Sequence, residues 1–352
     1  MVGAGVIGLA TAWQLQRHGH AVTLVDPRPP GPQEAGSGSS AALGLLMAQV
    51  FHRNRGRAWQ LRQRSLDLWQ HWRHDLDLPW RPGLLLLAAS EEEAERQRRL
   101  VTERQALGMP LSWWPTERLA ALTPELPGAG RWGALHSAAD GQIDPPLLLE
   151  RLRRAFRAAG GNELADRAVA IEAVAGADRW RLRLAAGGNH RSPWLVLAAG
   201  LGNDALLQGL GGSGCRQEPV LGQALELQLP AGLTAEPWPG SLCWQGINLV
   251  PRAAGRLWLG ATLEPGRRAD PEALASLQQL NGAAPPWLLE ATVLRQWQGL
   301  RSRPKQQPAP VLEEPEPGLL VLAGAYRNGV LLAPACATWA QERISEGFTC
   351  SR

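Results

Sequence analysis

The chain has 352 residues, of which 45% are hydrophobic and 19% are charged, and its formal net charge is +4. This length allows two domains with cores of their own, and the composition is ordinary for a globular enzyme. No stretch approaches the roughly 18 consecutive apolar residues that a membrane span needs. Charged residues near the start argue against a signal peptide. The sequence therefore predicts a cytoplasmic protein without a membrane span.

Lys305 is the only lysine, so nearly all basic residues are arginines, and they are spread among acids. The local cluster at 53–57 indicates a solvated surface rather than a nucleic-acid interface. The four cysteines, at 215, 243, 336 and 350, show no metal-ligand spacing and no CxxC pair, and we expect reduced thiols. Neither a nucleic-acid partner nor a metal site is expected.

The N-terminus carries a glycine fingerprint, which reads MVGAGVIG over the first eight residues. Gly3 permits a tight turn, Gly5 lets the backbone approach a pyrophosphate, and Gly8 lets a helix pack close to the sheet. Residues 9–18 are expected as that helix and 21–25 as the next strand, and Asp26 at its end suits a ribose hydroxyl. This order predicts a dinucleotide-binding βαβ unit. The strand before Gly3 would hold only residues 1–2, so we expect the true start to lie upstream.

Further elements follow in chain order. A small-residue loop at 36–46 suits close passage of the backbone along a pyrophosphate, although a flexible linker is the alternative. Residues 57–74 show helical periodicity. Residues 84–88 are expected as a strand, and Ser90 with Glu93 as the capping box of the next helix. A helix at 146–159 and short strands at 169–171 and 180–184 come next.

The second half begins with a buried strand at 194–199 that enters a glycine turn at Gly200. Backbone there could close over the adenosine half of a cofactor; an ordinary parallel strand ending in glycine is the alternative. Strands at 222–228, 248–251, 257–260 and 293–298 suit an antiparallel sheet inserted between nucleotide-binding segments. A strand at 318–324, a loop at 325–329 and a helix at 330–344 return to nucleotide-binding character.

Seven motifs together resemble the D-amino-acid-oxidase superfamily of FAD-dependent oxidoreductases, and within it the glycine-oxidase branch. They span most of the chain in the family's order, and the last is the most specific to that branch. The motifs are GAGVIG at 3–8, SAALG at 40–44, DGQIDP at 140–145, LVPR at 249–252, GAT at 260–262, GLR at 299–301 and YRNGVLLAP at 326–334.

The resemblance implies an α/β fold: a Rossmann-like, doubly wound FAD-binding domain of the glutathione-reductase type with an inserted α+β substrate domain. We expect the FAD-binding domain at 1–80, 138–215 and 300–352, and the substrate domain at 81–137 and 216–299. FAD is the implied cofactor. The implied cofactor-binding residues are Gly3, Gly5, Val6, Ile7, Gly8, Asp26, Gly38, Ser39, Leu43, Gly44, Leu45, Val169, Gly200, Ala325, Tyr326, Arg327, Asn328, Gly329, Val330 and Leu331.

The resemblance also places Arg301 and Arg327 at the substrate, and Asn248 in its pocket, where glycine oxidases commonly have a tyrosine. An α-amino acid presents a planar carboxylate, which the fork of an arginine can bind bidentately. For both arginines a surface position is the alternative. The expected reaction is FAD-dependent oxidative deamination of a small amino acid or amine. Hydride would pass from the α carbon to the flavin, and dioxygen would reoxidise it.

Other functions stay open. A dehydrogenase of the same fold would pass electrons to a quinone or a protein carrier. A non-catalytic flavin-binding remnant would account for the short first strand and for Asn248. A nicotinamide dehydrogenase would leave the C-terminal arginine loop without a purpose. A homo-oligomer is also left open.

Overall fold

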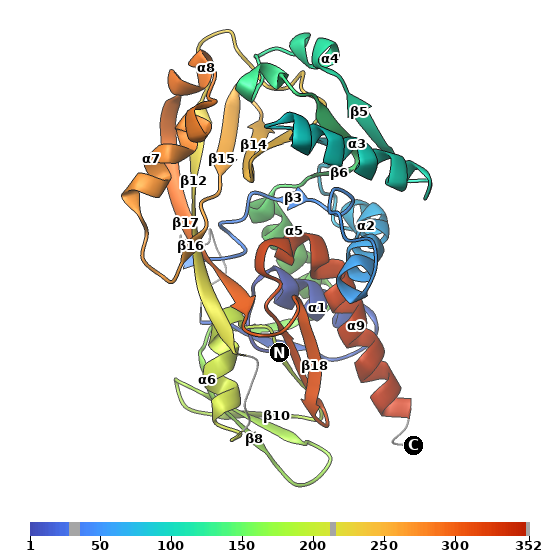
Figure 1. Cartoon of the computed structure of the whole chain (residues 1–352). Helices are drawn as coiled ribbons and strands as arrows, with labels where there is room; N and C mark the ends of the chain where they lie inside the picture. The colour runs from blue at the N-terminus through green and yellow to red at the C-terminus, as the bar shows by residue number, and fades with distance from the viewer. Residues whose placement is uncertain (28–35, 212–215, 350–352) are drawn as a thin grey trace.

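The structure, a computed structural model, describes residues 1–27, 36–211 and 216–349. Two main sheets carry the fold. The first is a mostly parallel sheet close to both chain termini, and the second is a larger curled sheet in the upper half of Figure 1. We call them the parallel sheet and the large sheet.

The parallel sheet has the order β7–β1–β11–β19–β18, and Val2 lies between β1 and β11. Val2 makes single parallel bridges to Val25 and to Leu197, so the short segment expected as the first strand occupies the centre of the sheet. All strands run parallel except β18, which is antiparallel to β19. The strands are β1 (Thr23–Val25), β7 (Asn162–Leu164), β11 (Leu195–Leu197), β18 (Val311–Glu316) and β19 (Leu319–Ala323).

Two layers cover this sheet, because its strands are apolar on both faces. In β19, Leu320 and Leu322 pack with the helices, whereas Leu319 and Val321 pack with the layer on the other face. The helical layer is α1 (Val6–Arg17), α2 (Arg57–Asp75), α5 (Pro145–Ala158) and α9 (Gly329–Thr349). The other layer is the antiparallel sheet of β8 (Ala168–Ala173), β9 (Trp180–Leu184) and β10 (Asn189–Ser192), with α6 (Asn203–Gln208).

The large sheet has the order β2–β17–β12–β15–β14–β13–β4–β6–β3, with β16 beside β12 and β5 beside β6. Its central strands are antiparallel, except that β13 and β4 run parallel. The strands are β2 (Gly36–Ser37), β3 (Leu45–Leu46), β4 (Arg81–Leu87), β5 (Leu111–Trp114), β6 (Ala134–Gln142), β12 (Gln217–Gln228), β13 (Ser241–Trp244), β14 (Ile247–Arg252), β15 (Arg256–Gly260), β16 (Glu264–Pro265) and β17 (Thr292–Pro304).

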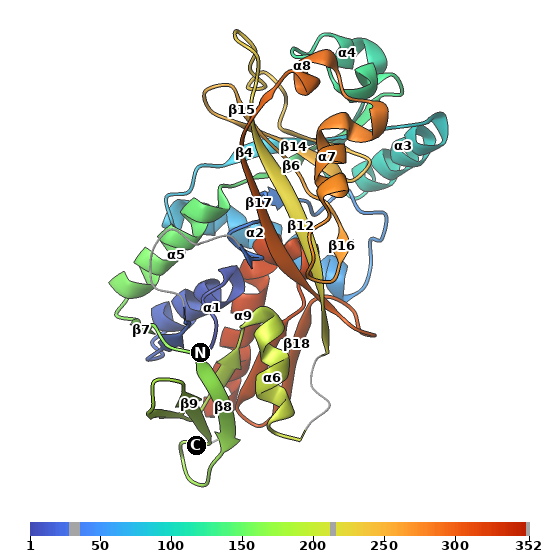
Figure 2. The same ribbon diagram turned by 90° about the vertical axis from the view of Figure 1, so that its left-hand side faces the viewer.

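One face of the large sheet packs on short helices far from the parallel sheet. Leucines of β12, β14 and β15 form a core with Leu277 of α7, Leu288 of α8 and Leu119 of α4. β12 and β17 run side by side down the molecule (Figure 2). The remaining helical elements are α3 (Glu91–Gln105), α4 (Thr116–Ala120), α7 (Pro271–Gln279), α8 (Pro286–Leu289), and the 3-10 turns η1 (Pro127–Gly130), η2 (Gly200–Gly202), η3 (Leu280–Gly282) and η4 (Tyr326–Asn328).

The expected elements are present, with shifted ends. The helices predicted at 57–74 and 146–159 are α2 and α5, and Ser90 caps α3 by accepting a hydrogen bond from Glu93 N at 3.2 Å. The strands predicted between 222 and 298 lie in the large sheet, whereas β6 was not predicted and crosses the expected domain boundary at 138. The division into domains at the expected residues stays a prediction.

Three expectations concern membranes, metals and thiols. Within residues 1–27, 36–211 and 216–349, no helix is long and apolar enough to cross a bilayer. The same part of the chain holds no group of three His, Cys, Asp or Glu side chains arranged to bind a metal ion. Cys243 and Cys336 are buried free thiols, and Cys215 and Cys350 lie outside the described residues.

Candidate active site

The glycine fingerprint forms a tight turn between the centre of the parallel sheet and α1. Gly3 has a φ of +100°, and a Cβ there would lie 2.5 Å from the Ala198 carbonyl oxygen. A Cβ on Gly8 would lie 1.9 Å from the Gly3 carbonyl oxygen. The Asp26 carboxylate accepts a hydrogen bond from Ala4 N at 2.7 Å. The turn is therefore tied to the end of β1 and has room only for glycine at these positions.

The N-termini of α1 and α9 lie close together. α1 begins at Val6, with no side-chain cap from Gly5 and no acidic residue in its first turn. α9 begins at Gly329, where a Cβ would lie 3.8 Å from Val6 Cγ1, and its first turn also lacks an acid. The side chains of Val330 and Leu331 are buried in the core. Two positive helix ends thus converge, which suits an anionic group such as a pyrophosphate.

The loop at 38–45 lies between α1 and the large sheet. Ser39 Oγ accepts a hydrogen bond from Val6 N at 3.0 Å, which joins the loop to the first turn of α1. On the other side, a Cβ on Gly38 would lie 2.5 Å from the Leu300 carbonyl oxygen, and β2 pairs with β17 just before the loop. Such close contact on both sides does not fit a flexible linker.

A cavity of about 280 Å³ opens at the end of β1, beside Asp26 and Ala4. Its walls include Leu164 from the neighbouring strand β7. The expected adenosine contacts are less closely grouped. Gly200 begins η2, shortly after the end of β11, whereas Val169 lies on β8 in the antiparallel layer and is 47% exposed.

One face of the large sheet is turned toward the loop at 38–45. Residues directly opposite each other in paired strands share a face. Ala224, Gly260, Asn248 and Cys243 form such a row across β12, β15, β14 and β13. Ala224 packs in one apolar cluster with Leu43 of the loop, which identifies the face. Asn248 lies directly opposite Gly260, which has no side chain.

Asn248 and Cys243 are polar groups buried on this face. Asn248 is 7% exposed, and within the described residues its amide oxygen has no hydrogen-bond partner. Leaving a buried acceptor unpaired costs about 1–3 kcal/mol, so a ligand is one explanation for it. Burial raises the pKa of the Cys243 thiol to about 11, so that it is a neutral thiol rather than a nucleophile at neutral pH.

Arg301 lies within β17, and its guanidinium lies against the backbone of Gly222 on β12. Its Nη1 donates to the carbonyl oxygens of Leu221 at 3.2 Å and Thr262 at 3.0 Å. Burial lowers the pKa of Arg301, and the positive charge of Arg327 lowers it further. An arginine nevertheless stays charged in proteins. A half-buried cation is therefore fixed on the sheet.

Arg327 comes from η4, which contacts β17 and leads directly into α9. Its side chain is exposed, and within the described part of the chain it forms no hydrogen bond or ion pair. Ala325, just before η4, is buried. The structure thus brings the two predicted substrate arginines near each other from separate elements. Whether they bind a substrate stays a prediction.

Sequence reasoning missed two buried groups that hold the segment after the loop. Asp140 of β6 is fully buried and accepts hydrogen bonds from Ala48 N at 2.7 Å and Gln49 N at 3.2 Å. Burial raises the pKa of this carboxyl to about 6, against the effect of these bonds. Arg104 of α3 is also buried and donates to the Phe51 carbonyl oxygen at 2.6 Å. The DGQIDP motif was a signal for Asp140. Arg104 resembles its exposed neighbours on α3, so no signal in the sequence indicated that it is buried.

A parallel sheet with a glycine turn, an acid at the end of β1 and converging helix N-termini defines a dinucleotide-binding fold of the Rossmann type. The family model described as FAD dependent oxidoreductase matches residues 1–343, and the chain belongs to that family. Its cofactor is FAD. The glycines with no room for a Cβ, and the start of α1 beside that of α9 with no acidic residue in either first turn, fit the pyrophosphate of this cofactor.

Relatives and solved structures agree along almost the whole chain. A glycine oxidase of Geobacillus kaustophilus is 28% identical over 346 residues, which cover 95% of this chain and 89% of the relative. A putative thiamine biosynthesis oxidoreductase, ThiO, of Rhizobium etli is 29% identical, with coverages of 97% and 94%. The crystal structure of the G. kaustophilus glycine oxidase has a TM-score of 0.85 at 28% identity, and covers 97% of this chain and 93% of that one. An L-proline dehydrogenase from P. horikoshii, at 19% identity and a TM-score of 0.84, covers 98% and 92% and shares the fold.

Proposed function

We propose that this protein oxidises the carbon–nitrogen bond of a small amino acid or amine, with FAD as the hydride acceptor and dioxygen as the final oxidant. The observation that carries the proposal is the half-buried guanidinium of Arg301, on the sheet face that the loop at 38–45 covers. The names of the relatives, glycine oxidases and a ThiO, support the substrate class and a place in thiamine biosynthesis.

Arg301 and Arg327 bind the substrate carboxylate in this proposal. Nη1 of Arg301 is already bonded to two carbonyl oxygens, which fixes the plane of the guanidinium. Arg327 has its donors free within the described residues and approaches from η4. Two cations offer the planar donors that match a carboxylate, which lysine cannot reproduce. Asn248 lines the pocket, and its amide oxygen can accept a hydrogen bond from the substrate.

The chain's own contribution to the reaction is binding and electrostatics rather than acid–base chemistry. FAD, held at the glycine turn and the start of α1, would supply the redox chemistry, with dioxygen as the final acceptor of the two electrons. The positive end of α9 stabilises negative charge that develops beside it. The substrate amine reacts in its neutral form, and the imine product hydrolyses in water.

The first experiment identifies the substrate class. The purified holoprotein is mixed anaerobically with a panel of small amino acids and uncharged amines, and the flavin absorbance is recorded. We expect small amino acids to bleach the flavin band, and admission of air to restore it with uptake of oxygen. Bleaching by uncharged amines alone would refute the carboxylate argument. Reoxidation by a quinone but not by dioxygen would show a dehydrogenase instead.

The second experiment tests the arginines. A charge-assisted hydrogen bond contributes about 1.5–3 kcal/mol, and 1.4 kcal/mol corresponds to a factor of ten. Arg327→Ala should therefore raise the apparent KM about tenfold to a hundredfold and leave the flavin spectrum almost unchanged. Arg327→Lys should recover only part of this loss. If Arg327→Ala has the same KM as the parent, Arg327 does not bind the substrate carboxylate.

A further inference from the structure

Residues 142–144, at the end of β6, join three parts of the molecule. Gln142 Nε2 donates to the Pro251 carbonyl oxygen of β14 at 2.9 Å. Ile143 N donates to the carbonyl oxygen of Gly44, in the loop at 38–45, at 3.0 Å. Asp144 caps α5 through its Oδ1. The large sheet, the loop and a helix of the parallel-sheet layer therefore meet at this segment.

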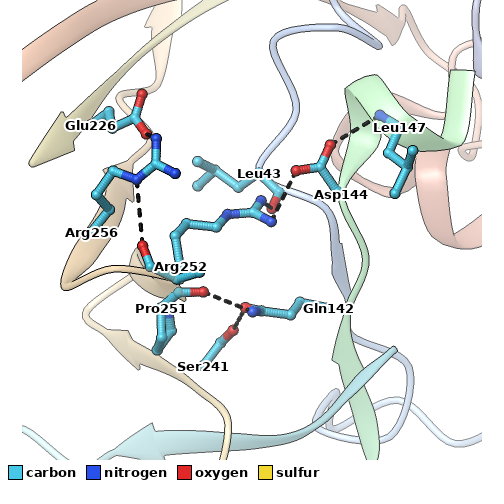
Figure 3. Close-up of polar contacts among 10 residues, drawn as sticks. Leu43, Gln142, Asp144, Leu147, Glu226, Ser241, Pro251, Arg252 and Arg256 are labelled. Carbon is cyan, nitrogen blue, oxygen red and sulfur yellow. Dashed lines mark hydrogen bonds and ion pairs between the residues drawn. The ribbon is translucent and has the colours of Figure 1, made fainter. Parts of the chain in front are cut away.

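Arg252, the last residue of β14, reaches into this junction (Figure 3). Its Nη1 forms an ion pair with Asp144 Oδ2 at 3.2 Å, and its Nη2 donates to the Leu43 carbonyl oxygen at 3.4 Å. The guanidinium carbon lies 3.5 Å from the centre of the Trp258 ring. Arg256, on the next strand, points instead to Glu226, away from the loop.

The Arg252 guanidinium is expensive to bury. Its side chain is 14% exposed, and within the described residues its Nε has no partner. Burial lowers the pKa of Arg252 to about 10, and the charges of Asp144 and Glu226 oppose that fall. The group is thus a cation at neutral pH. A buried ion pair often adds little to the net free energy of folding. We therefore expect the pair between Arg252 and Asp144 to matter mainly for the position of the groups that Arg252 joins.

One of those groups, the Leu43 carbonyl, belongs to the loop at 38–45, which Ser39 joins to the first turn of α1. Among residues 41–44, the Ala41 carbonyl accepts from Trp297 Nε1 at 3.1 Å, the Leu43 carbonyl accepts from Arg252, and the Gly44 carbonyl is bonded to the segment after β6. Trp297 is itself in edge contact with Trp258, at 5.2 Å between ring centres. Among the described residues, donors outside the loop therefore bind three of these four carbonyls, and Arg252 is the charged donor of the three.

We propose that Arg252, through its bridge between Asp144 and the Leu43 carbonyl, is a positioning residue that fixes the FAD-binding loop and so sets how slowly FAD leaves. The proposal rests on FAD as the cofactor and on the prediction that residues 38–45 line it. It does not depend on the identity of the substrate, so its test uses none and can succeed or fail independently of the amine oxidation proposed above.

The experiment measures the rate at which holoprotein releases FAD after dilution, from the rise in flavin fluorescence. Arg252→Met keeps the apolar stem over Trp258 but removes both hydrogen bonds. We expect release about tenfold faster, the factor typical of losing one charge-assisted bond. Asp144→Asn keeps an acceptor for the α5 cap and should accelerate release to a smaller extent. The double variant should be no faster than Arg252→Met, because the two residues act as one unit.

Arg256→Met is the matched control, since it removes an arginine and an ion pair from the neighbouring strand without touching the loop. It should release FAD at the parent rate. Arg252→Lys should lie between parent and Arg252→Met, because lysine can reach one partner but cannot bridge two. Parent-like release from Arg252→Met, or equal acceleration in Arg256→Met, would overturn the proposal.

A second readout separates positioning from general stability. FAD raises the melting temperature of the holoprotein above that of the apoprotein by an amount that follows its affinity. Arg252→Met should reduce the difference in melting temperature between holoprotein and apoprotein, and Arg256→Met should leave that difference unchanged. If Arg252→Met instead lowers both melting temperatures equally, the residue is only structural and the proposal fails. Should Arg252→Met not fold, Asp144→Asn alone decides the same question.

Discussion

Gly222→Ala should weaken substrate binding by displacing Arg301 without unfolding the protein. A Cβ at residue 222 would lie 2.2 Å from Arg301 Nη2 and 2.3 Å from Nη1, where ordinary contact begins at 3.4 Å. The guanidinium must therefore move by about 1.2 Å, which breaks a hydrogen bond of ordinary length. The obstacle is the end of a flexible side chain, and alanine suits a strand better than glycine by roughly 0.5–1 kcal/mol. The free energy of unfolding should change by less than about 1 kcal/mol.

The assay compares steady-state kinetics of parent, Gly222→Ala, Arg301→Ala and the double variant on whichever amino acid bleaches the flavin. Loss of a charge-assisted contact of about 1.5–3 kcal/mol predicts a rise in apparent KM of about tenfold to a hundredfold for Gly222→Ala. Because that effect acts through Arg301, adding Gly222→Ala to Arg301→Ala should raise KM no further. A Gly222→Ala variant within twofold of the parent, or a further loss in the double variant, would refute the reasoning.

Three more outcomes are expected. Because the folded-state pKa of Asp140 is raised to about 6 from 3.8, the folded protein binds a proton there between these pH values that the unfolded chain has released. Urea titrations should therefore show that the free energy of unfolding of the parent falls by up to about 3 kcal/mol relative to that of Asp140→Asn between pH 4 and 6, and falls no further above pH 6. A difference between the two proteins that stays constant with pH would contradict this. Gly8→Ala puts a Cβ 1.9 Å from the Gly3 carbonyl, backbone that cannot yield, so the flavin absorbance per protein should fall severely; full FAD content would disprove the packing argument. Asn248→Tyr should raise kcat/KM for glycine relative to larger amino acids, and an unchanged ratio would remove residue 248 from the pocket.

Local patterns predicted most of the fold because each element obeys one strong rule. The glycine turn, the capped helix at Ser90 and the apolar strand before Gly324 are short-range features that neighbouring residues specify. β6 was missed because its residues, ALHSAADGQ, neither alternate between apolar and polar nor include the bulky side chains that are typical of strands. Its burial comes from distant partners on both sides, including β4 and β3. No local pattern encodes such a strand.

The predicted end of the strand at 293–298 differs from the observed end of β17. The strand continues beyond residue 298 to Pro304 and carries Arg301 within it. The glycine at 299 is required by a close approach, since a Cβ there would lie 2.4 Å from the Ala41 Cβ. A residue that normally interrupts a strand is here the place where another segment crosses it.

Only part of the candidate site could be predicted from the sequence. The roles of Arg301 and Arg327 came from resemblance to a family and stay predictions. Nothing in the local sequence indicated that Arg104 would be buried or that Arg252 would bridge to Leu43, because both contacts join segments more than 50 residues apart. Periodicity predicts on which face of a helix or strand a residue lies, but not which distant segment it contacts there.

The long ladder between β12 and β17 limits how the molecule can move. The strands have 12 and 13 residues, a span of about 40 Å at the usual rise. They extend from the helices α7 and α8 down to η2 at the edge of the parallel sheet (Figure 2). A hinge that opened the large sheet away from the parallel sheet would have to bend or break this ladder. Arg301 is part of this ladder, where it pairs with Val220 of β12, so its backbone position is set by the pairing of the two strands. We therefore expect access for a small substrate to depend on side chains and short loops such as η4, rather than on closure of the large sheet over the substrate.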